Sequence, residues 1–579
     1  MIGTGQIRAL GAVAVFVTVA ATFAVNARNE FVRIDDYDYI AQNPHIQNGL
    51  TPRSVVWSFA AVGYAANWHP LTWLSHAADV TIARALGLDY AEMPNPIGVW
   101  AKVRSSFARF VHGENVALHA VNAVLLYFVI LALIRPSAAR PSGVGDAVVA
   151  AVCALLWAVH PLRVEVVAWA SERKELLSVC FMLLTMLAYI RGIVVVVEKS
   201  CTKAVSNSIV QLPLFSTTSF YYTFSLFTFT FSLLAKPVAV ALPAVLVAVD
   251  LFRGERDWRR IVERVSPFVL LSAVACLLTM QAQTGALSQG GAFPWKVRLA
   301  AALAAPAVYL RQTVWPVGLC LDYAMPTWGD APWIAAGAVL HLAVLASGVL
   351  WLRAALRGRA ASFGWRLVPL AVAWCYVCLI PMLGIVKVGY EPHSDRYTYW
   401  VGCGLAAVVA LVLARTEPAW RSMAGCFALL AAVPLCILIN GTVERSRVWA
   451  NNVALMSDMV GQTRNPFMAH VLASEYAVRG EHAKAGEMLR DVAEGNPCAC
   501  SFGALAWHLA RRGDDGEAER WADRAFEREP ENVFALGAKG LILKNRGKRA
   551  EAVPYLERSL RQNADRELSE ALEACKEGR

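Results

Sequence analysis

Apolar runs of nearly bilayer-spanning length recur through most of this chain, and they restrict its fold more than any other feature. These runs approach the ~20 residues that an α-helix needs to cross a membrane. They extend from residue 8 to residue 441 of 579, and only 17% of all residues are charged. The sequence therefore predicts an all-α, polytopic membrane body over residues 1–445. The eleven expected spans are about 8–27, 115–134, 146–160, 175–195, 218–235, 237–252, 265–281, 333–352, 367–383, 398–414 and 422–441.

Basic residues fall in alternate loops between the expected spans, and they predict the orientation of the body. Cytoplasmic loops of membrane proteins carry an excess of Lys and Arg. Segment 296–316 breaks the alternation if it crosses fully, and it contains Pro306 and Pro316, so we expect it to be external or re-entrant. The loops expected in the cytoplasm contain Arg135 and Arg140; Arg191, Lys199 and Lys203; Arg253, Arg256, Arg259, Arg260 and Arg264; Arg353, Arg357, Arg359 and Arg366; and Arg415 and Arg421.

Eleven crossings place three loops and the C-terminal region outside the cytoplasm. The loops are 28–114, 160–174 and 384–397. This arrangement also accounts for the net charge of +10 through membrane topology, so nucleic acid is not an expected partner. Membrane lipids are the expected partners of the apolar spans.

Three similar segments of 33–34 residues follow the last expected span. Small residues, glycines and prolines recur at matching positions, namely Gly480, Gly513 and Gly547; Ala485, Ala518 and Ala552; and Pro497 and Pro530. This pattern resembles the tetratricopeptide repeat, in which paired helices meet at small residues and stack into a solenoid. The sequence predicts such an α-solenoid within residues 446–579. Its groove would bind a polypeptide, although a role as spacer or oligomer contact stays open.

Polar motifs lie at the predicted outer edges of the spans. The acidic pair Asp35-Asp36 follows the first span. Two carboxylates this close raise each other's pKa and suit a reaction that needs a base or a metal ion. The other motifs are Asn67-Trp68-His69-Pro70-Leu71-Thr72, His160-Pro161 with Glu165, the run Glu172-Arg173-Lys174-Glu175, Lys236-Pro237, and Ser394-Asp395-Arg396-Tyr397.

In this order, the motifs and the repeats resemble the transmembrane-and-tetratricopeptide O-mannosyltransferases and their bacterial relatives. That family belongs to the C-type glycosyltransferases, which use lipid-linked sugars. The resemblance implies transfer of a sugar, with mannose a candidate, from a polyprenyl-phosphate donor to a Ser or Thr hydroxyl of an extracytoplasmic protein. It also implies a multi-pass protein of the bacterial inner membrane with its repeats outside the cytoplasm. Residues 88–111 lengthen the first outer loop, and the repeat array is short.

The resemblance also suggests residue roles. Asp35 or Asp36 would be the base, with a slight preference for Asp36. A phosphate leaving group needs cations, and Arg173, Lys236 and Arg396 are the candidates. The supporting residues, near the sugar or a divalent cation, are His69, His160, Glu165, Glu172 and Asp395. Whether a divalent cation is needed stays open.

Each motif also has a purely structural explanation. The acidic pair can cap an interfacial helix, and the two His-Pro pairs can begin helices. Glu172 and its charged neighbours can form a salt-bridged face, and Lys236 can extend to the headgroups. Asp395 and Arg396 can pair with each other, while His119 and Asn122 are expected to make hydrogen bonds between helices. Two other functions stay open: transfer of a sugar to a lipid or surface glycan, and a non-catalytic scaffold.

Overall fold

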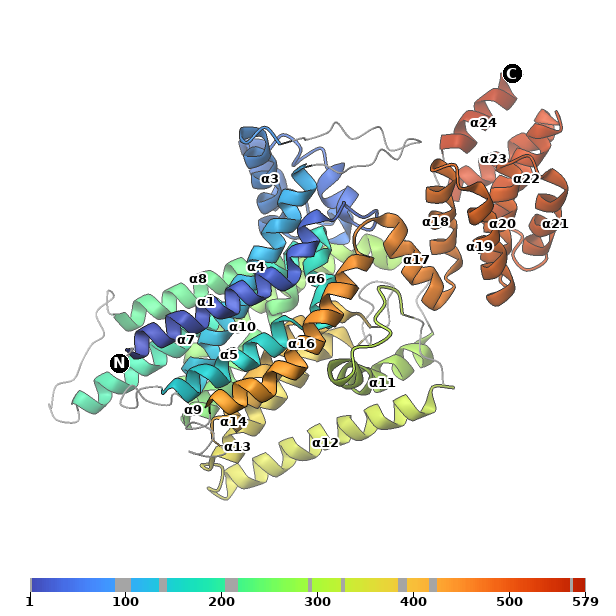
Figure 1. Cartoon of the computed structure of the whole chain (residues 1–579). Helices are drawn as coiled ribbons and strands as arrows, with labels where there is room; N and C mark the ends of the chain where they lie inside the picture. The colour runs from blue at the N-terminus through green and yellow to red at the C-terminus, as the bar shows by residue number, and fades with distance from the viewer. Residues whose placement is uncertain are drawn as a thin grey trace. The chain divides into compact units, whose positions relative to one another are not determined.

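The computed structural model is helical over the residues that it describes, which are 3–88, 106–134, 143–203, 217–289, 294–323, 329–383, 393–415, 424–562 and 566–577. No β-strand occurs among these residues. They form two compact units, and the boundary lies between Arg447 and Val448. The first unit contains the long helices α1 to α16, and the second contains the shorter helices α17 to α24 (Figure 1).

Eight helical segments of the first unit are long and apolar enough to cross a membrane, as a multi-pass membrane protein requires. Each of them overlaps a span expected from the sequence. They are Thr4–Arg28 (α1, Thr4–Phe23, and η1, Ala24–Arg28), Ser106–Ile134 (α4), Ala170–Ile193 (η5, Ala170–Glu172, and the start of α7), Trp258–Thr284 (in α10, Trp258–Gln289), Ala331–Leu356 (α12), Phe363–Met382 (α13, Phe363–Ala371; η7, Val372–Tyr376; and η8, Val377–Met382), Asp395–Leu413 (η9, Asp395–Tyr397, and α14, Thr398–Leu413) and Ala428–Val448 (in α16, Ala424–Val448).

A ninth candidate span is bent. Helix α5 (Val144–Ala158) and the segment Pro161–Ala168 (η4 and α6) meet at 62°. The bend lies at His160, whose ψ of 138° is extended, because a residue before proline is disfavoured in the helical region. The bend separates α5 from the polar segment that follows it.

Three further expected segments fall on helices outside these nine. Residues 218–235 correspond to α8 (Thr217–Ala235), and 237–252 correspond to η6 (Pro237–Ala241) and α9 (Leu242–Arg253). Segment 296–316 corresponds to α11 (Trp295–Val314). Helix α8 packs against α7 (Arg173–Lys203), and α11 packs against α12. Both thus belong to the helical body.

Helix α4 is central to the first unit, since it packs against α1, α5, α7 and α14. Its polar side chains make hydrogen bonds to these neighbours. His119 Nδ1 lies 2.7 Å from Tyr399 Oη, and its Nε2 lies 2.9 Å from the Ala158 carbonyl oxygen. Asn122 donates to the Leu176 carbonyl oxygen at 3.0 Å. The expected interhelical role of His119 and Asn122 is confirmed.

Short helices follow α1 and bring the first polar motifs back onto the body. They are η2 (Tyr37–Ala41), α2 (Pro52–Ala60), η3 (Tyr64–Ala66) and α3 (Pro70–Ala85). Thr51 begins α2 as the sequence predicts, because its hydroxyl accepts from Ser54 N at 3.1 Å and Pro52 occupies the first turn. Trp73 of α3 is fully buried, and the Tyr39 ring packs against it at 4.5 Å between ring centroids, with the ring planes tilted by 36°.

The second unit consists of α17 followed by three helix pairs and a last helix. The three pairs are separated internally by Gly480, Gly513 and Gly547, whose φ angles of 75–80° are in the left-handed region that glycine adopts without strain. The elements are α17 (Asn452–Thr463), α18 (Pro466–Val478), α19 (His482–Gly495), α20 (Ala499–Arg511), α21 (Asp515–Phe526), α22 (Val533–Asn545), α23 (Arg549–Gln562) and α24 (Arg566–Lys576).

Candidate functional site

Glu172 is the centre of a cluster of ion pairs at one end of the helical body. Its Oε2 lies 2.9 Å from Lys236 Nζ, and its Oε1 lies 3.2 Å from Lys174 Nζ and 3.9 Å from Arg396 Nε. The Glu172 side chain is only 2% exposed. A buried carboxylate is tolerated only when it is paired and hydrogen-bonded, and here three cations surround it. The charge cluster thus joins three segments that are far apart in the sequence.

Lys236 reaches this cluster from the junction between α8 and η6. Pro237 begins η6 and holds Lys236 in an extended conformation, with a ψ of 134°. Its ammonium group contacts Glu175 Oε2 at 3.0 Å in addition to Glu172. An ammonium group carries three N–H donors, and the side chain keeps 15% of its surface exposed. Lys236 is therefore held in position by two carboxylates, and its side chain stays partly exposed.

Arg396 enters from η9 and is held by a second carboxylate. Its Nη1 lies 2.5 Å from Glu165 Oε1, and the Ser394 hydroxyl donates to the same oxygen at 2.8 Å. The guanidinium carbon lies 5.5 Å from the centroid of the Trp169 ring, a cation–π distance. The side chain is 13% exposed. Of the third expected outer loop, residues 384–392 lie outside the described residues.

The acidic pair is divided between two environments. Asp36 is fully buried and accepts backbone hydrogen bonds from Val32 N at 3.0 Å and from Ser171 N at 2.8 Å. It thereby ties the segment after α1 to the segment that carries Glu172. Burial raises the pKa of Asp36 to about 7, against the opposing effect of these two N–H donors. This placement argues against Asp36 as the accessible base.

Asp35 has the opposite environment. Its side chain is 43% exposed, and its Oδ2 lies 3.5 Å from Lys174 Nζ. Its φ of 60° is in the left-handed region, which aspartate tolerates better than most residues but which still indicates local strain. The left-handed turn lets Asp35 lie at the exposed edge of the charge cluster while its neighbour is buried.

Lys174 links Asp35 to Glu172, and the sequence assigned it no role of its own. Its ammonium group lies 4.4 Å from the centroid of the Tyr39 ring and is almost completely buried. The signal is present in the run Glu172–Glu175, but within that run the sequence gives a site role only to Glu172 and Arg173. Lys174 contacts Asp35 and Glu172, whereas Glu175 contacts Lys236. The sequence also assigns no role to Tyr39, and it names Ser394 only as part of the motif around Arg396.

Arg173 lies in a different network. Its guanidinium contacts Asp79 Oδ2 at 2.5 Å, Glu114 Oε2 at 2.8 Å and Asn115 Oδ1 at 2.8 Å, and its side chain is 2% exposed. These partners come from α3 and α4. The placement argues against the expectation that Arg173 binds a donor phosphate, because its donors are directed to groups of the protein.

The two histidines begin helical segments, in agreement with the structural alternative. His160 Nδ1 accepts from Leu162 N at 3.2 Å, so its Nε2 donates to the Thr313 carbonyl oxygen at 3.0 Å. Both ring nitrogens are thus used within the protein. His69 precedes α3 and is buried, and its Nδ1 makes no hydrogen bond within the described residues. Burial, reinforced by the charges of Lys174 and Lys236, lowers the pKa of His69 well below its usual value.

Asp395 is buried beside Arg396 and accepts a hydrogen bond from Tyr323 Oη at 2.7 Å. Tyr323 in turn accepts from Gln312 Nε2 at 2.9 Å. Because α11 ends just beyond Gln312, this chain of hydrogen bonds connects η9 to α11. Asp395 therefore supports the position of η9, and through it that of Arg396.

A largely apolar cavity of about 380 Å³ lies next to this segment. Its walls come from α5, α11, η7, η8, α14 and α16, and its polar lining includes Arg163 and Thr398. Arg163 Nη2 donates to Thr398 Oγ1 at 2.8 Å, so the polar part of the lining is tied to the start of α14. Thr398 follows Arg396 by two residues, and the cavity thus adjoins the charge cluster.

Carboxylates and cations nearly balance in the charge cluster. The cations are Lys174, Lys236 and Arg396, and the carboxylates are Asp35, Glu165, Glu172 and Glu175. Within the described residues, no group of three or more His, Cys, Asp or Glu side chains is arranged to hold a metal ion. The cluster is an arrangement of preformed ion pairs.

No family model matches this chain, and no curated protein matches it either.

Asp36 should make stability depend on pH in a defined direction. Its pKa in the folded protein, about 7, is above its ordinary value of 3.8, so the contribution from protonated Asp36 is present at low pH and is lost as the pH rises through 7. We expect the melting temperature of wild type to exceed that of Asp36→Asn by more at pH 5 than at pH 8. In addition, the variant amide can accept only one of the two backbone hydrogen bonds, which costs about 1–3 kcal/mol at any pH.

The matched control for this measurement is Asp38→Asn, because Asp38 is an exposed acid in the same segment. It should change the melting temperature little. A difference between wild type and Asp36→Asn that is constant from pH 5 to pH 8 would contradict the buried-acid interpretation.

Proposed function

We propose that this chain is an integral-membrane glycosyltransferase that moves a sugar from a polyprenyl-phosphate donor to a hydroxyl group. The observation that carries the proposal is the convergence of Asp35, Lys236 and Arg396. These residues come from three distant segments, are connected through Glu172 and Lys174, and each keeps part of its side chain exposed. The proposal agrees with the resemblance noted in the sequence.

In the proposed reaction, each of the three partly exposed side chains has a separate role. The acceptor oxygen attacks the anomeric carbon, and its proton passes to Asp35. The bond between the anomeric carbon and the phosphate oxygen breaks, and that oxygen keeps the electron pair. Lys236 and Arg396 stabilise the resulting negative charge on the lipid phosphate. Glu165 and Glu172 hold these cations in place and do not themselves react.

Asp35 is preferred over Asp36 for accessibility. A general base has to approach the acceptor hydroxyl within hydrogen-bond distance, and the Asp35 carboxylate is 43% exposed whereas Asp36 is enclosed by backbone donors. Lys174, 3.5 Å from Asp35, keeps that carboxylate oriented. If a divalent cation takes part, it joins with the donor phosphate, since the described side chains do not assemble a metal site.

The apolar cavity beside Thr398 offers a place for part of the donor lipid. It is lined by apolar side chains of α5, α11 and α14 and adjoins the segment that carries Arg396. A polyprenyl phosphate has a charged head and an apolar chain, and such ligands favour an apolar pocket with few polar groups at its end. The cavity and the charge cluster together therefore match both parts of the proposed donor.

We further propose eleven spans for the membrane body, with α8 and η6–α9 crossing in addition to the nine candidate segments. This topology requires the expected outer loops to be on one side of the membrane. The contacts of Glu172 with Lys174 and Arg396, and of Lys174 with Asp35, support it because they connect all three of those loops. The repeats would then be extracytoplasmic.

The second unit is proposed to be a tetratricopeptide solenoid that holds a polypeptide acceptor. Its helix pairs turn at glycines spaced by 33 and 34 residues, and Ala485, Ala518 and Ala552 are completely buried between helices. Small buried residues at this spacing allow neighbouring helices to pack closely. A Ser or Thr hydroxyl of a protein is therefore the preferred acceptor, and a lipid or surface glycan is the alternative.

Replacement of Asp35 by Asn should reduce sugar transfer by about 100- to 10,000-fold, the usual contribution of a general base. The measurement is transfer from a polyprenyl-phosphate sugar by the purified protein in detergent. The melting temperature should change little, because Asp35 is partly exposed. Asp38→Asn removes the same charge from the same segment and should keep most of the activity. Equal rates for the two variants would exclude Asp35 as the base.

Replacement of Arg396 by Lys should weaken binding of the donor by roughly tenfold. The substitution keeps the charge but loses the planar fork that binds phosphate through two hydrogen bonds. Arg173→Lys is the matched control: it should lower the melting temperature, since it breaks a buried network, but leave donor affinity unchanged. If Arg396→Lys has normal donor affinity, or Arg173→Lys shares its defect, the assignment of the phosphate site is wrong.

Removal of residues 449–579 should reduce transfer to a protein acceptor more than it reduces hydrolysis of the donor. This cut follows the end of α16 and removes α17 with the pairs, so that no half of a packed pair is left. None of the proposed catalytic groups is lost. Equal loss of both reactions in a folded truncated protein would show that the second unit supports the membrane body. No loss of either reaction would favour a lipid or glycan acceptor.

A further inference from the structure

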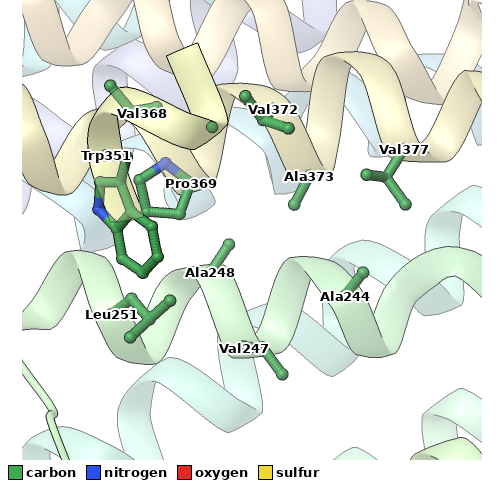
Figure 2. Close-up of a pocket in the computed structure, with 11 residues that line it drawn as sticks. Ala244, Val247, Ala248, Leu251, Trp351, Val368, Pro369, Val372, Ala373 and Val377 are labelled. Carbon is green, nitrogen blue, oxygen red and sulfur yellow. The ribbon is translucent and has the colours of Figure 1, made fainter. Parts of the chain in front are cut away.

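A second cavity lies between α9 on one side and α12 with α13 and η7 on the other. It has a volume of about 220 Å³ and is lined by apolar side chains, among them Ala244, Ala248 and Leu251 of α9 (Figure 2). Several lining side chains, including Val247 and Trp351, are only partly buried, so the cavity opens at the surface of the helical body. An apolar cavity does not hold water well. An apolar molecule is the occupant that suits this space.

The surrounding segments determine which apolar molecule is available. Three of the four walls belong to candidate membrane spans, since Ala331–Leu356 is α12 and Phe363–Met382 contains α13 and η7. The cavity is therefore within the part of the chain that contacts lipid, where acyl chains are the common apolar partner. It is distinct from the cavity beside Thr398, with which it shares no lining residue.

Arginines follow the cavity at one end. Arg353 follows Trp351, which lines the cavity, by two residues, and Arg357 and Arg359 follow it by six and eight residues. All three are exposed, and their side chains make no hydrogen bond or ion pair within the described residues. No Asp or Glu occurs between Ala331 and Leu383. Within that segment no acid therefore compensates the arginines, and the acids Asp250 and Glu255, near the end of α9, pair with Arg264.

Trp351 provides an additional polar group at the same end. Its indole Nε1 is buried and has no hydrogen-bond partner within the described residues. Figure 2 shows this nitrogen at the Leu251 end of the cavity and not at the Ala244 end. Leu251 precedes Arg253 by two residues. A buried donor without an acceptor is unfavourable, so an oxygen atom of a bound molecule would satisfy it.

We propose that this cavity and its arginines form a binding site for one anionic phospholipid. One acyl chain fills the space between α9 and α13, the Trp351 indole N–H donates to an ester or phosphate oxygen, and Arg353 and Arg357 pair with the phosphate. A bias of basic residues toward cytoplasmic loops accounts for the arginines alone. It does not account for the empty apolar volume or for the unsatisfied indole. The proposal does not depend on the glycosyltransferase assignment.

The test measures binding of phosphatidylglycerol to the full-length, delipidated protein in detergent, by native mass spectrometry and by melting temperature. Phosphatidylcholine with the same acyl chains is the zwitterionic comparison. We expect phosphatidylglycerol to bind as one retained molecule and to raise the melting temperature, and phosphatidylcholine to do so much less. No preference of the wild-type protein for phosphatidylglycerol would overturn the proposal.

Two variants test the contributions of the lipid headgroup and of the acyl chain to binding separately. Arg353→Gln combined with Arg357→Gln should weaken binding of phosphatidylglycerol by roughly 30-fold, since each arginine near an anionic lipid contributes roughly fivefold in affinity and the two factors multiply. Ala248→Leu should reduce binding by filling the cavity while leaving both arginines in place. Where Ala248→Leu fails to fold, the arginine variant decides the question alone.

The matched control is Arg259→Gln combined with Arg260→Gln. These exposed arginines begin α10 in the neighbouring loop, but neither lines the cavity. The loop that precedes them contacts the loop after α12, since Arg256 Nη2 donates to the Ala360 carbonyl oxygen at 2.7 Å. The control should retain normal binding. Equal losses in both double variants would show a general attraction to charge and overturn the proposed site.

Discussion

The pairing of buried Glu172 with Lys174, Lys236 and Arg396 is the interaction on which the arrangement of the polar end depends. A carboxylate removed from water is strongly unfavourable unless cations compensate it, and loss of one partner from such a pair costs about 3–5 kcal/mol. Glu172 therefore fixes the positions of the α8–η6 junction and of η9 relative to the start of α7. In turn, the carboxylate lies among the three cations and offsets their mutual repulsion.

A second, weaker connection completes this end of the body. Asp36 accepts backbone hydrogen bonds from both its own segment and Ser171, so it joins the loop after α1 to the loop before α7. The left-handed conformation of Asp35 follows from this anchoring, since the chain has to reverse direction between an exposed and a buried residue. Local strain of this kind is found where the surrounding structure determines the geometry. Two adjacent aspartates thus acquire different chemistry from their environment alone.

The two apolar cavities of the membrane body differ in the chemistry of their linings. The cavity beside Thr398 adjoins the charge cluster and contains polar lining residues, whereas the cavity between α9 and α13 has apolar walls and exposed arginines at one end. Each combines an apolar volume with a nearby cation, which is the pattern that lipid-phosphate ligands require. The proposed donor site and the proposed phospholipid site therefore share one physical principle, and the segment η7–η8 contributes different residues to each.

The sequence by itself determined the all-helical class, the positions of the long apolar helices, the Thr51–Pro52 helix start and the interhelical role of His119. These features follow from local periodicity, from capping and from the cost of burying polar groups, which act over a few residues. It did not determine which polar residues meet. Only the tertiary structure placed Arg173 with Asp79 and Glu114, buried Asp36, exposed Asp35 and made Lys174 the link to Glu172. The physical reason is that burial and ion pairing depend on contacts between distant segments, so adjacent charged residues with the same local pattern reach opposite environments.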